Sequence, residues 1–501
     1  MNKKKAMTNI IVSTIFRVLV LISGLIARRY LINTLGEEAT GLFSLFTSII
    51  GFLSIAELGI GTAITFSMYK PIVNGDQDTI SGLYYLYRKI YRIILIIIVV
   101  VGLSITPLIP YFADGNTGTY NIYLTYVLFL SSTLITYIYA HKTAFINAHM
   151  DNYVTSIIRS SGLILESILQ VIVLIKFKSF NLFLTTLIIS NLLQWITTSI
   201  IFKRKYSLGL TKNKELTKEV KKEVKNKTKA IFMHKIGGLL VTTTDSIIIG
   251  AFVSIIFLGR YSNYMLIMTG MISVLSLIFT SIASVIGQSY AKSTKDEFHQ
   301  QYLFAYFLNF IIALVFFLGF WAIINDLIAI IFNSEVILDK SIVFFITVTY
   351  FMNFMRQAMI IFREASGTFY YDRYKPLAEG LLNLILSLIL VRFLGISGVL
   401  IGTIITNLTI CMPIEPYVLY KYGFEKSVKR YQIVNYGLLV LFILTLFLFN
   451  IFKIDTISNI FLRVITNGLI SVAISVLIIT ILIIFNKNIK KIIANYFKKL
   501  K

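Results

Sequence analysis

The sequence predicts an all-α integral membrane protein of about 14 transmembrane helices, with two pseudo-symmetric six-helix lobes and two additional C-terminal helices. Three observations predict this fold: recurring apolar stretches, basic residues concentrated on one side of the membrane, and a short internal repeat. Apolar runs of roughly 20 residues recur from Ile10 to Phe485, and such a run spans the ~30 Å hydrocarbon core of a bilayer as a helix. Hydrophobic residues make up 57% of the chain and charged residues 14%, whereas soluble proteins contain about a quarter charged residues.

The expected spans are separated by short polar links. They lie near residues 8–31, 40–67, 93–112, 120–140, 153–175, 180–202, 231–255, 262–289, 303–331, 341–363, 374–393, 396–420, 431–452 and 460–485. Only the link between the sixth and seventh spans is long.

The basic residues predict the orientation. With a cytoplasmic N-terminus, the external side receives Arg28, Arg29, Lys176, Lys178, Arg260, Lys340, Arg392, Lys453 and Arg463. Nearly all the other Lys and Arg residues, 47 in total, then fall on the cytoplasmic side. This positive-inside bias supports a multi-pass protein of the cell (cytoplasmic) membrane with both termini in the cytoplasm.

The long link, residues 203–230, is basic and cytoplasmic in this topology. Its segment 214–225 places Leu216, Val220 and Val224 four residues apart, on one face of a helix. Basic residues surround that face, which is the pattern of a helix lying on a membrane surface. A solvated basic linker is the alternative interpretation.

An internal repeat indicates two equivalent halves. Residues 174–191 and 390–407 are identical at six of 18 positions without gaps, and each segment is expected to be a tight external turn followed by a span. We therefore expect an N-terminal lobe (1–202), a linker (203–230), a C-terminal lobe (231–420), and two additional helices with a basic tail (421–501). Two lobes of the same orientation are a transporter architecture, with its site at the repeat interface.

Several function classes are disfavoured. The single cysteine, Cys411, and four scattered histidines provide no disulfide, no metal-ligand spacing and no cofactor motif. The net charge of +24 is explained by basic residues flanking spans, so we expect contact with anionic membrane lipids and not with nucleic acid. Catalytic signatures are also missing from the sequence. We expect neither an enzyme, nor a cofactor, nor a bound metal.

Basic residues in the first span are the candidate substrate-binding residues. Arg17 is expected near the membrane midplane, and Arg28 follows 11 positions later, within roughly 20° of the same helix face. Arg29 lies beside Arg28. A charged group at membrane depth usually faces a partner or a water-filled cavity, and guanidinium groups bind phosphate oxygens. The hypothesis is that Arg17, Arg28 and Arg29 attract a phosphate-bearing substrate; the alternative is that Arg28 and Arg29 extend to the outer headgroups.

Acidic residues inside spans are candidates for ion coupling or for structural ion pairs. Glu57 lies at a depth similar to that of Arg17, so a salt bridge between them is expected. Glu166 follows Arg159 by seven residues on one helix face. The remaining candidates are Asp245, Glu379 and Glu415. Together these acids predict a hydrated interior.

Short glycine-led motifs resemble a known family. They are Leu35-Gly36-Glu37-Glu38-Ala39-Thr40-Gly41-Leu42-Phe43, Phe52-Leu53-Ser54-Ile55-Ala56-Glu57-Leu58-Gly59-Ile60-Gly61, Asp245 with Ile249-Gly250, Leu258-Gly259-Arg260-Tyr261, Leu394-Gly395-Ile396-Ser397-Gly398 and Gly402-Thr403. They resemble the bacterial polysaccharide repeat-unit flippases (O-antigen and capsule exporters of the Wzx type) of the multidrug/oligosaccharidyl-lipid/polysaccharide (MOP) exporter superfamily. The resemblance covers most of the chain.

The resemblance implies two six-helix lobes around a cationic cavity that opens alternately to each side. It implies transport of an undecaprenyl-diphosphate-linked oligosaccharide repeat unit from the inner to the outer leaflet, coupled to an ion gradient. The expected partners are the lipid-linked oligosaccharide, membrane lipids, and the polysaccharide polymerase and assembly machinery. The superfamily motifs do not identify the sugar.

Two alternatives stay open. A membrane polysaccharide polymerase of the same pathway typically has a large external loop, which this sequence lacks. A multidrug exporter, or an exporter of another lipid-linked precursor, belongs to the same superfamily; drug exporters usually have twelve spans, and the last two predicted spans favour the polysaccharide branch.

Overall fold

A computed structural model of the chain describes residues 3–57, 59–113, 119–207, 209–211 and 216–485. The described residues are 91% helical and contain no strand. Within these residues, ten helical segments are long and apolar enough to cross a membrane, and a shorter apolar stretch covers 236–252 of a longer helix. The all-α, multi-pass prediction is therefore confirmed, while the count of fourteen spans stays a prediction.

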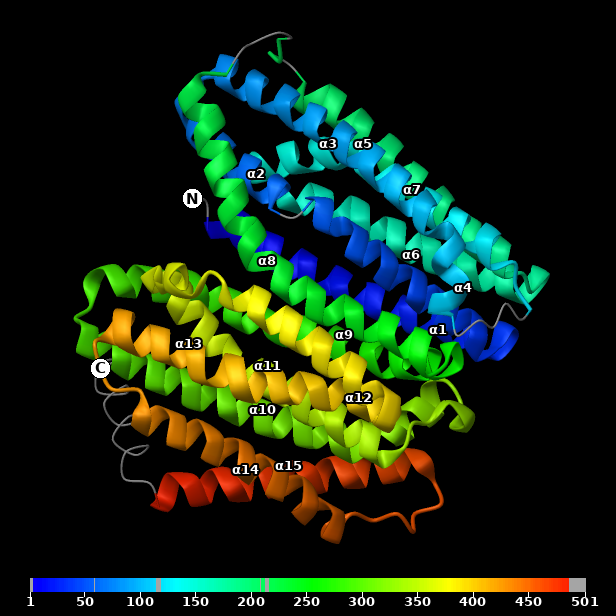
Figure 1. Ribbon diagram of the computed structural model, residues 1–501, viewed down its shortest axis with the longest axis vertical. Helices are drawn as coiled ribbons and strands as arrows, with labels where there is room; N and C mark the ends of the chain where they lie inside the picture. Colours follow the sequence, from blue (N-terminus) through cyan, green and yellow to red (C-terminus); the bar gives the residue numbers. More distant parts are fainter. Residues whose placement is uncertain (1–2, 58, 114–118, 208, 212–215, 486–501) are drawn as a thin grey trace. The chain divides into compact units, whose positions relative to one another are not determined.

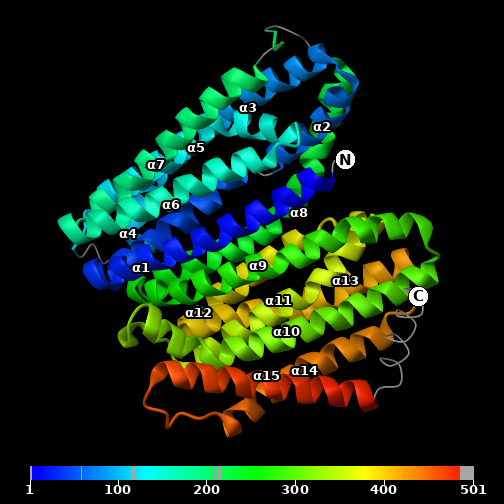
Figure 2. The same ribbon diagram turned by 180° about the vertical axis from the view of Figure 1, so that it is seen from behind.

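The chain divides into two compact units, residues 1–266 and 267–501, shown in Figures 1 and 2. The first unit contains α1 (Lys3–Leu53), α2 (Ile60–Asn74), α3 (Gln77–Ile105), α4 (Ile109–Phe112), α5 (Ile122–Ala148), α6 (Asn152–Phe177), α7 (Phe180–Ile201) and α8 (Lys218–Phe252). Helix α9 (Ile255–Lys292) begins in the first unit and ends in the second. The second unit continues with α10 (Lys295–Ile331), α11 (Lys340–Ser366), α12 (Lys375–Thr406), α13 (Met412–Val418), α14 (Lys429–Phe452) and α15 (Ile460–Phe485). The predicted domain boundaries stay predictions.

Helices α1 and α12 each reverse direction at a glycine. Gly36 has φ 83° and Gly395 has φ 55°, a region that an L side chain rarely adopts. In α1 the reversal brings Arg28 to within 3.1 Å of Ser44. In α12 it brings Asn383 to within 2.7 Å of Thr403. Each long helix thus contains two antiparallel segments. They correspond to the predicted span 8–31 and the first part of 40–67 in α1, and to 374–393 and the first part of 396–420 in α12.

The two repeat segments have the same local structure. Residues 174–191 end α6 at Lys178, which has φ 47°, and begin α7 two residues later. Residues 390–407 contain the Gly395 reversal of α12. In the first segment the Ser190 hydroxyl donates to the Gly162 carbonyl across the helix pair, 2.9 Å away. In the second, a side chain at Gly398 would collide with the Leu390 carbonyl. The repeat is therefore a helix–reversal–helix unit whose helices pack closely.

The linker differs from the sequence interpretation. Helix α8 begins at Lys218, where the Thr217 hydroxyl accepts a hydrogen bond from the Val220 amide at 3.4 Å, and it continues without a break through the predicted seventh span. Leu216 and Val224 are only 8% and 5% exposed. The predicted apolar face is therefore largely covered by protein within the first unit, and not free to lie on the membrane surface. Lys214 and its neighbours at 212–215 lie outside the described residues.

Two of the glycine-led motifs meet where α1 crosses α9. Arg260 reaches the Glu37 carboxylate with Nε at 2.5 Å and Nη2 at 3.1 Å, a forked geometry that fixes both groups. A side chain at Gly41 would collide with the carbonyl oxygen of Ile255, and one at Gly259 would place its Cβ 2.6 Å from the Glu37 carbonyl. The helix backbones approach so closely here that only glycine fits.

We predict that Gly41→Ala lowers the stability of the protein by about 1–3 kcal/mol, because the added methyl group must push the backbones apart. Gly24→Ala is the matched control, since nothing lies within 4 Å of a Cβ at Gly24. Thermal unfolding of the purified protein in detergent gives the melting temperatures of both variants. An unchanged melting temperature for Gly41→Ala would show that the crossing is loosely packed.

Candidate functional site

Arg28 lies on α1 and is 9% exposed. Its Nε donates to Asn263 Oδ1 at 2.9 Å, and its Nη2 donates to the Ser44 hydroxyl at 3.1 Å and to the Ser262 hydroxyl. These partners are neutral, and within the part of the chain that the structure describes no carboxylate forms an ion pair with Arg28. A cation held by neutral dipoles keeps its full charge available for an anion.

Arg17 and Arg29 have a different environment from that of Arg28. Both are exposed on α1, as are their apolar neighbours Val18 and Ile26. The three predicted phosphate-binding residues thus share one helix but not one environment. The alternative that Arg28 extends to the outer headgroups does not fit its side chain, which is buried among protein groups.

Glu57 ends a short 3₁₀ turn, Ser54–Glu57, that follows α1. The Tyr91 hydroxyl of α3 donates to Glu57 Oε1, and the Tyr87 hydroxyl lies 3.3 Å from that of Tyr91. Gly59, with φ 83°, then redirects the chain into α2. The described hydrogen bond of Glu57 is therefore to Tyr91, and the expected salt bridge to Arg17 stays a prediction.

Glu57 lines a polar chamber of about 970 Å³ within the first unit, between α2, α3, α5, α6 and α7. Arg159 of α6 lines the same chamber, and these two are its charged residues among those the structure describes. The lining also carries many hydroxyl and amide groups, among them those of Thr62, Thr65, Thr133, Thr136, Thr143, Thr155, Ser156, Thr198, Asn147, Asn152, Asn191 and Gln194. A chamber of this size and polarity holds water, so the Glu57 side chain borders water.

Glu166 and Asp245 do not line this chamber. Glu166 is half-buried on α6, and its carboxylate accepts a hydrogen bond from Gln170 at 3.3 Å. Asp245 is 8% exposed on α8. Neither residue joins Glu57 in one site, and their predicted role in ion coupling stays a prediction.

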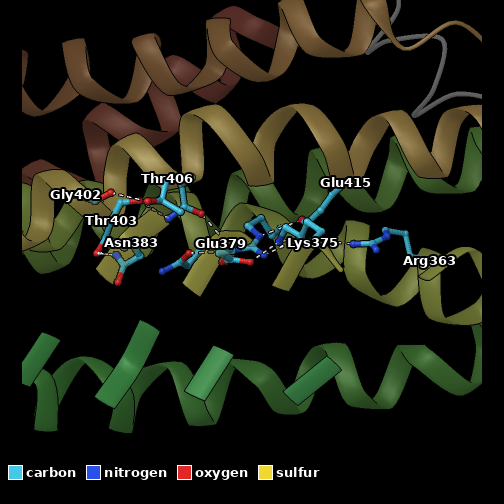
Figure 3. A network of polar contacts seen from close by, with 11 residues as sticks. Arg363, Lys375, Glu379, Asn383, Gly402, Thr403, Thr406 and Glu415 are labelled. Carbon is cyan, nitrogen blue, oxygen red and sulfur yellow. Dashed lines mark hydrogen bonds and ion pairs between the residues drawn. The ribbon is translucent and has the colours of Figure 1, made fainter. Parts of the chain in front are cut away.

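Glu379 belongs to a buried charge network in the second unit (Figure 3). Arg356 of α11 reaches Glu415 with Nη2 at 2.6 Å and Glu379 with Nη1 at 3.2 Å. Lys375 Nζ lies 2.5 Å from Glu379 and 2.6 Å from Glu415. Both carboxylates are therefore shared between two cations, so the network favours a structural ion pair for Glu379 over ion coupling.

Arg363 and Asp372 extend the charge network. Arg363 Nη1 lies 3.6 Å from Glu415, and its Nη2 pairs with Asp372. Three cations and three carboxylates therefore balance inside the protein. Sequence reasoning missed this cluster, although Lys375 and Glu379 are four residues apart on one helix, the spacing that allows an ion pair.

Metal binding at this network is disfavoured. Glu379, Cys411 and Glu415 each offer a ligand atom within 4.8 Å of the others. The carboxylates, however, already contact Arg356 and Lys375. A metal ion would have to displace two cations that the surrounding protein holds in place.

The fold is similar to that of several solved membrane transporters. The lipid II flippase MurJ in an inward closed conformation superposes with a TM-score of 0.68 and 14% identity, over 96% of this chain and 99% of that one. An inward-facing multidrug resistance MATE family transporter of the MOP superfamily gives a TM-score of 0.62 and 14% identity, over 82% of this chain and 98% of that one. The Vibrio cholerae MATE transporter VcmN in the bent form gives a TM-score of 0.52 and 14% identity, over 85% of this chain and 98% of that one.

These similar structures are transporters and a flippase, not enzymes. No family model matches the sequence, and a comparison with curated proteins gives no match either. The structural likeness extends over almost the whole chain only for MurJ among these three.

We predict that Glu415→Gln destabilises the protein by about 3–5 kcal/mol, because it removes one charge from a buried network and leaves its cations uncompensated. Glu425→Gln is the matched control: Glu425 pairs with Lys295, but its side chain is 65% exposed, and such a pair contributes about 0–1 kcal/mol. Thermal unfolding in detergent compares the two variants. Equal melting temperatures would contradict the structural role of the network.

Proposed function

We propose that the protein is a flippase that moves an undecaprenyl-diphosphate-linked oligosaccharide repeat unit from the inner to the outer leaflet by alternating access. The observation that carries the proposal is the buried Arg28, held by Asn263 and two serines and without a carboxylate partner among the described residues. A diphosphate headgroup supplies the anion that such a cation lacks.

The fold supports a lipid-linked substrate. MurJ, a lipid II flippase, shares the fold over 96% of this chain, including the region of the C-terminal helices α14 and α15. A flippase of this fold keeps the lipid tail in the bilayer while the polar headgroup crosses through water. The glycine-led motifs of the sequence favour an oligosaccharide repeat unit as that headgroup.

We assign diphosphate binding to Arg28 together with Arg17 and Arg29, and ion coupling to Glu57. The polar chamber beside Glu57 supplies the water that a proton-exchanging or cation-binding carboxylate requires. Movement of one charge through 100 mV of membrane potential provides ~2.3 kcal/mol. Glu166 and Asp245 are secondary candidates for coupling, and Glu379 serves as a structural ion pair.

A second candidate function is the export of a drug or of another lipid-linked precursor, including one that MurJ-like proteins carry. The likeness to MATE transporters favours it, since those structures cover more than four-fifths of this chain. The polymerase alternative is weaker, because the similar structures are transporters and a flippase.

Deletion of the gene, followed by mass spectrometry of accumulated lipid-linked intermediates, tests the proposed substrate. We expect intact repeat units to accumulate on the cytoplasmic leaflet. Single units on the outer leaflet would point to a polymerase instead, and unchanged intermediates would assign the protein to another substrate.

We predict that Arg17→Ala and Arg28→Ala abolish polymer export. Arg28→Lys should retain part of the export, because it keeps the charge but loses the forked geometry. Arg392→Ala is the matched control, since Arg392 is an exposed arginine on α12. Export is compared at equal protein abundance in the membrane. Full export by Arg28→Ala would remove this residue from the mechanism.

We predict that Glu57→Gln lowers the export rate at least tenfold and removes its dependence on the ion gradient, since the amide cannot take up a proton or a cation charge. Glu38→Gln is the control: Glu38 is an acid outside the chamber lining, and its carboxylate accepts from Thr119 at 3.3 Å. Flipping in vesicles with imposed proton or sodium gradients measures the effect. If the Glu57→Gln variant still transports in response to the ion gradient, the coupling site is not Glu57.

A further inference from the structure

A second cavity in the first unit is basic and adjoins the polar chamber. It measures about 580 Å³ and lies between α3, α5 and α7, which lie side by side in Figures 1 and 2. Arg88 and Arg92 of α3, Lys142 of α5 and Lys203 at the end of α7 line it. We call these four residues and the space between them the basic pocket.

The basic pocket contains no acid among its described lining residues. Across the described part of the chain, Arg88, Arg92 and Lys203 also form no ion pair. Lys142 Nζ donates to the Ser199 hydroxyl at 2.8 Å, which ties α5 to α7 at the pocket. Four cations held close together without carboxylates repel one another, and an anion among them relieves that repulsion.

The basic pocket lies where the apolar outer surface of these helices ends. Ile93 and Ile96 follow Arg92 on α3 and are 49% and 61% exposed. Ile196 and Ile200 precede Lys203 on α7 and are each 48% exposed. Exposed isoleucines on membrane-spanning helices contact acyl chains, so the four cations lie at the level of the headgroups.

We propose that the basic pocket binds the phosphate of an anionic phospholipid headgroup, whose acyl chains lie along the exposed isoleucines of α3 and α7. Basic pockets between transmembrane helices recognise such headgroups. A free inorganic phosphate shares the anion chemistry but lacks the chains, so the adjoining apolar surface favours the lipid. The inference goes beyond the proposed transport function and does not depend on it.

The pocket is separate from the polar chamber. Tyr91 and Tyr137 line both hollows, and Tyr91 contacts Glu57 on the chamber side. Glu57 does not line the basic pocket, and Arg88 and Arg92 do not line the chamber, so loss of lipid binding and loss of coupling at Glu57 are distinguishable by mutation.

Trp195 provides a direct probe of the basic pocket. The chain has two tryptophans: Trp195 lines the pocket, and Trp321 lies on α10. In a Trp321→Phe background, quenching of fluorescence by lipids with brominated acyl chains therefore reports on Trp195 alone. The full-length protein is reconstituted in phosphatidylcholine vesicles that contain increasing fractions of brominated phosphatidylglycerol, and brominated phosphatidylcholine serves as the neutral comparison.

We expect brominated phosphatidylglycerol to quench Trp195 at a much lower mole fraction than brominated phosphatidylcholine does. Arg88→Gln combined with Arg92→Gln should weaken this preference about 30-fold or more, since the headgroup phosphate then loses charge-assisted hydrogen bonds to two guanidinium groups. Lys89→Gln combined with Arg204→Gln is the matched control. Both of its residues are exposed neighbours outside the pocket lining. It removes the same net charge without a direct contact to the headgroup, so at physiological salt, which screens exposed charges, the preference should stay within about twofold.

An equal loss of the preference for phosphatidylglycerol in the pocket double variant and in the control double variant would overturn the proposal. A preference that millimolar inorganic phosphate abolishes would overturn the assignment to a lipid in favour of a free anion. If the Arg88 and Arg92 pair fails to fold, Lys203→Glu tests the same point from an exposed position: it should lower the preference for phosphatidylglycerol, and an unchanged preference would contradict the proposal.

Discussion

The free-energy cost of placing a charge in hydrocarbon is the constraint on which this structure depends. The two units satisfy it in different ways. In the second unit, Arg356 and Lys375 share the carboxylates of Glu379 and Glu415, so charge balances within the protein. In the first unit, Arg28 is surrounded by neutral donors and acceptors, and Glu57 borders a chamber large enough for water. A balanced network stabilises a fold, whereas an unbalanced charge near water can bind and release a ligand.

Backbone reversals make this arrangement of charges possible. The turn at Gly36 brings Ser44 to Arg28, and the close approach of Gly41 to Ile255 brings α9 against α1. Asn263 and Ser262 of α9 then reach the Arg28 guanidinium. The conformational freedom of one glycine and the small size of another thus determine the polar environment of a buried arginine.

The sequence was sufficient for the features that depend on composition and local pattern. Hydropathy predicted membrane helices, and the repeat at 174–191 and 390–407 predicted two matching reversals, which Lys178 and Gly395 provide. The surroundings of individual charges depend on which helices pack together, and hydropathy carries no such information. Arg17 and Arg28 share a predicted helix face, yet one is exposed and the other buried. The charge network around Glu415 was likewise missed, because hydropathy does not show that Arg356 and Lys375 lie beside Glu379 and Glu415.

The central claim is that the chain carries a lipid-linked diphosphate across the bilayer. The most direct measurement reconstitutes the purified protein in vesicles that contain an undecaprenyl-diphosphate-linked oligosaccharide confined at first to the inner leaflet. A membrane-impermeant glycosidase outside the vesicles then reports arrival of the sugar at the outer leaflet. The account predicts cleavage that rises with time and with the amount of protein. Cleavage no faster than in protein-free vesicles, under either a proton or a sodium gradient, would contradict it.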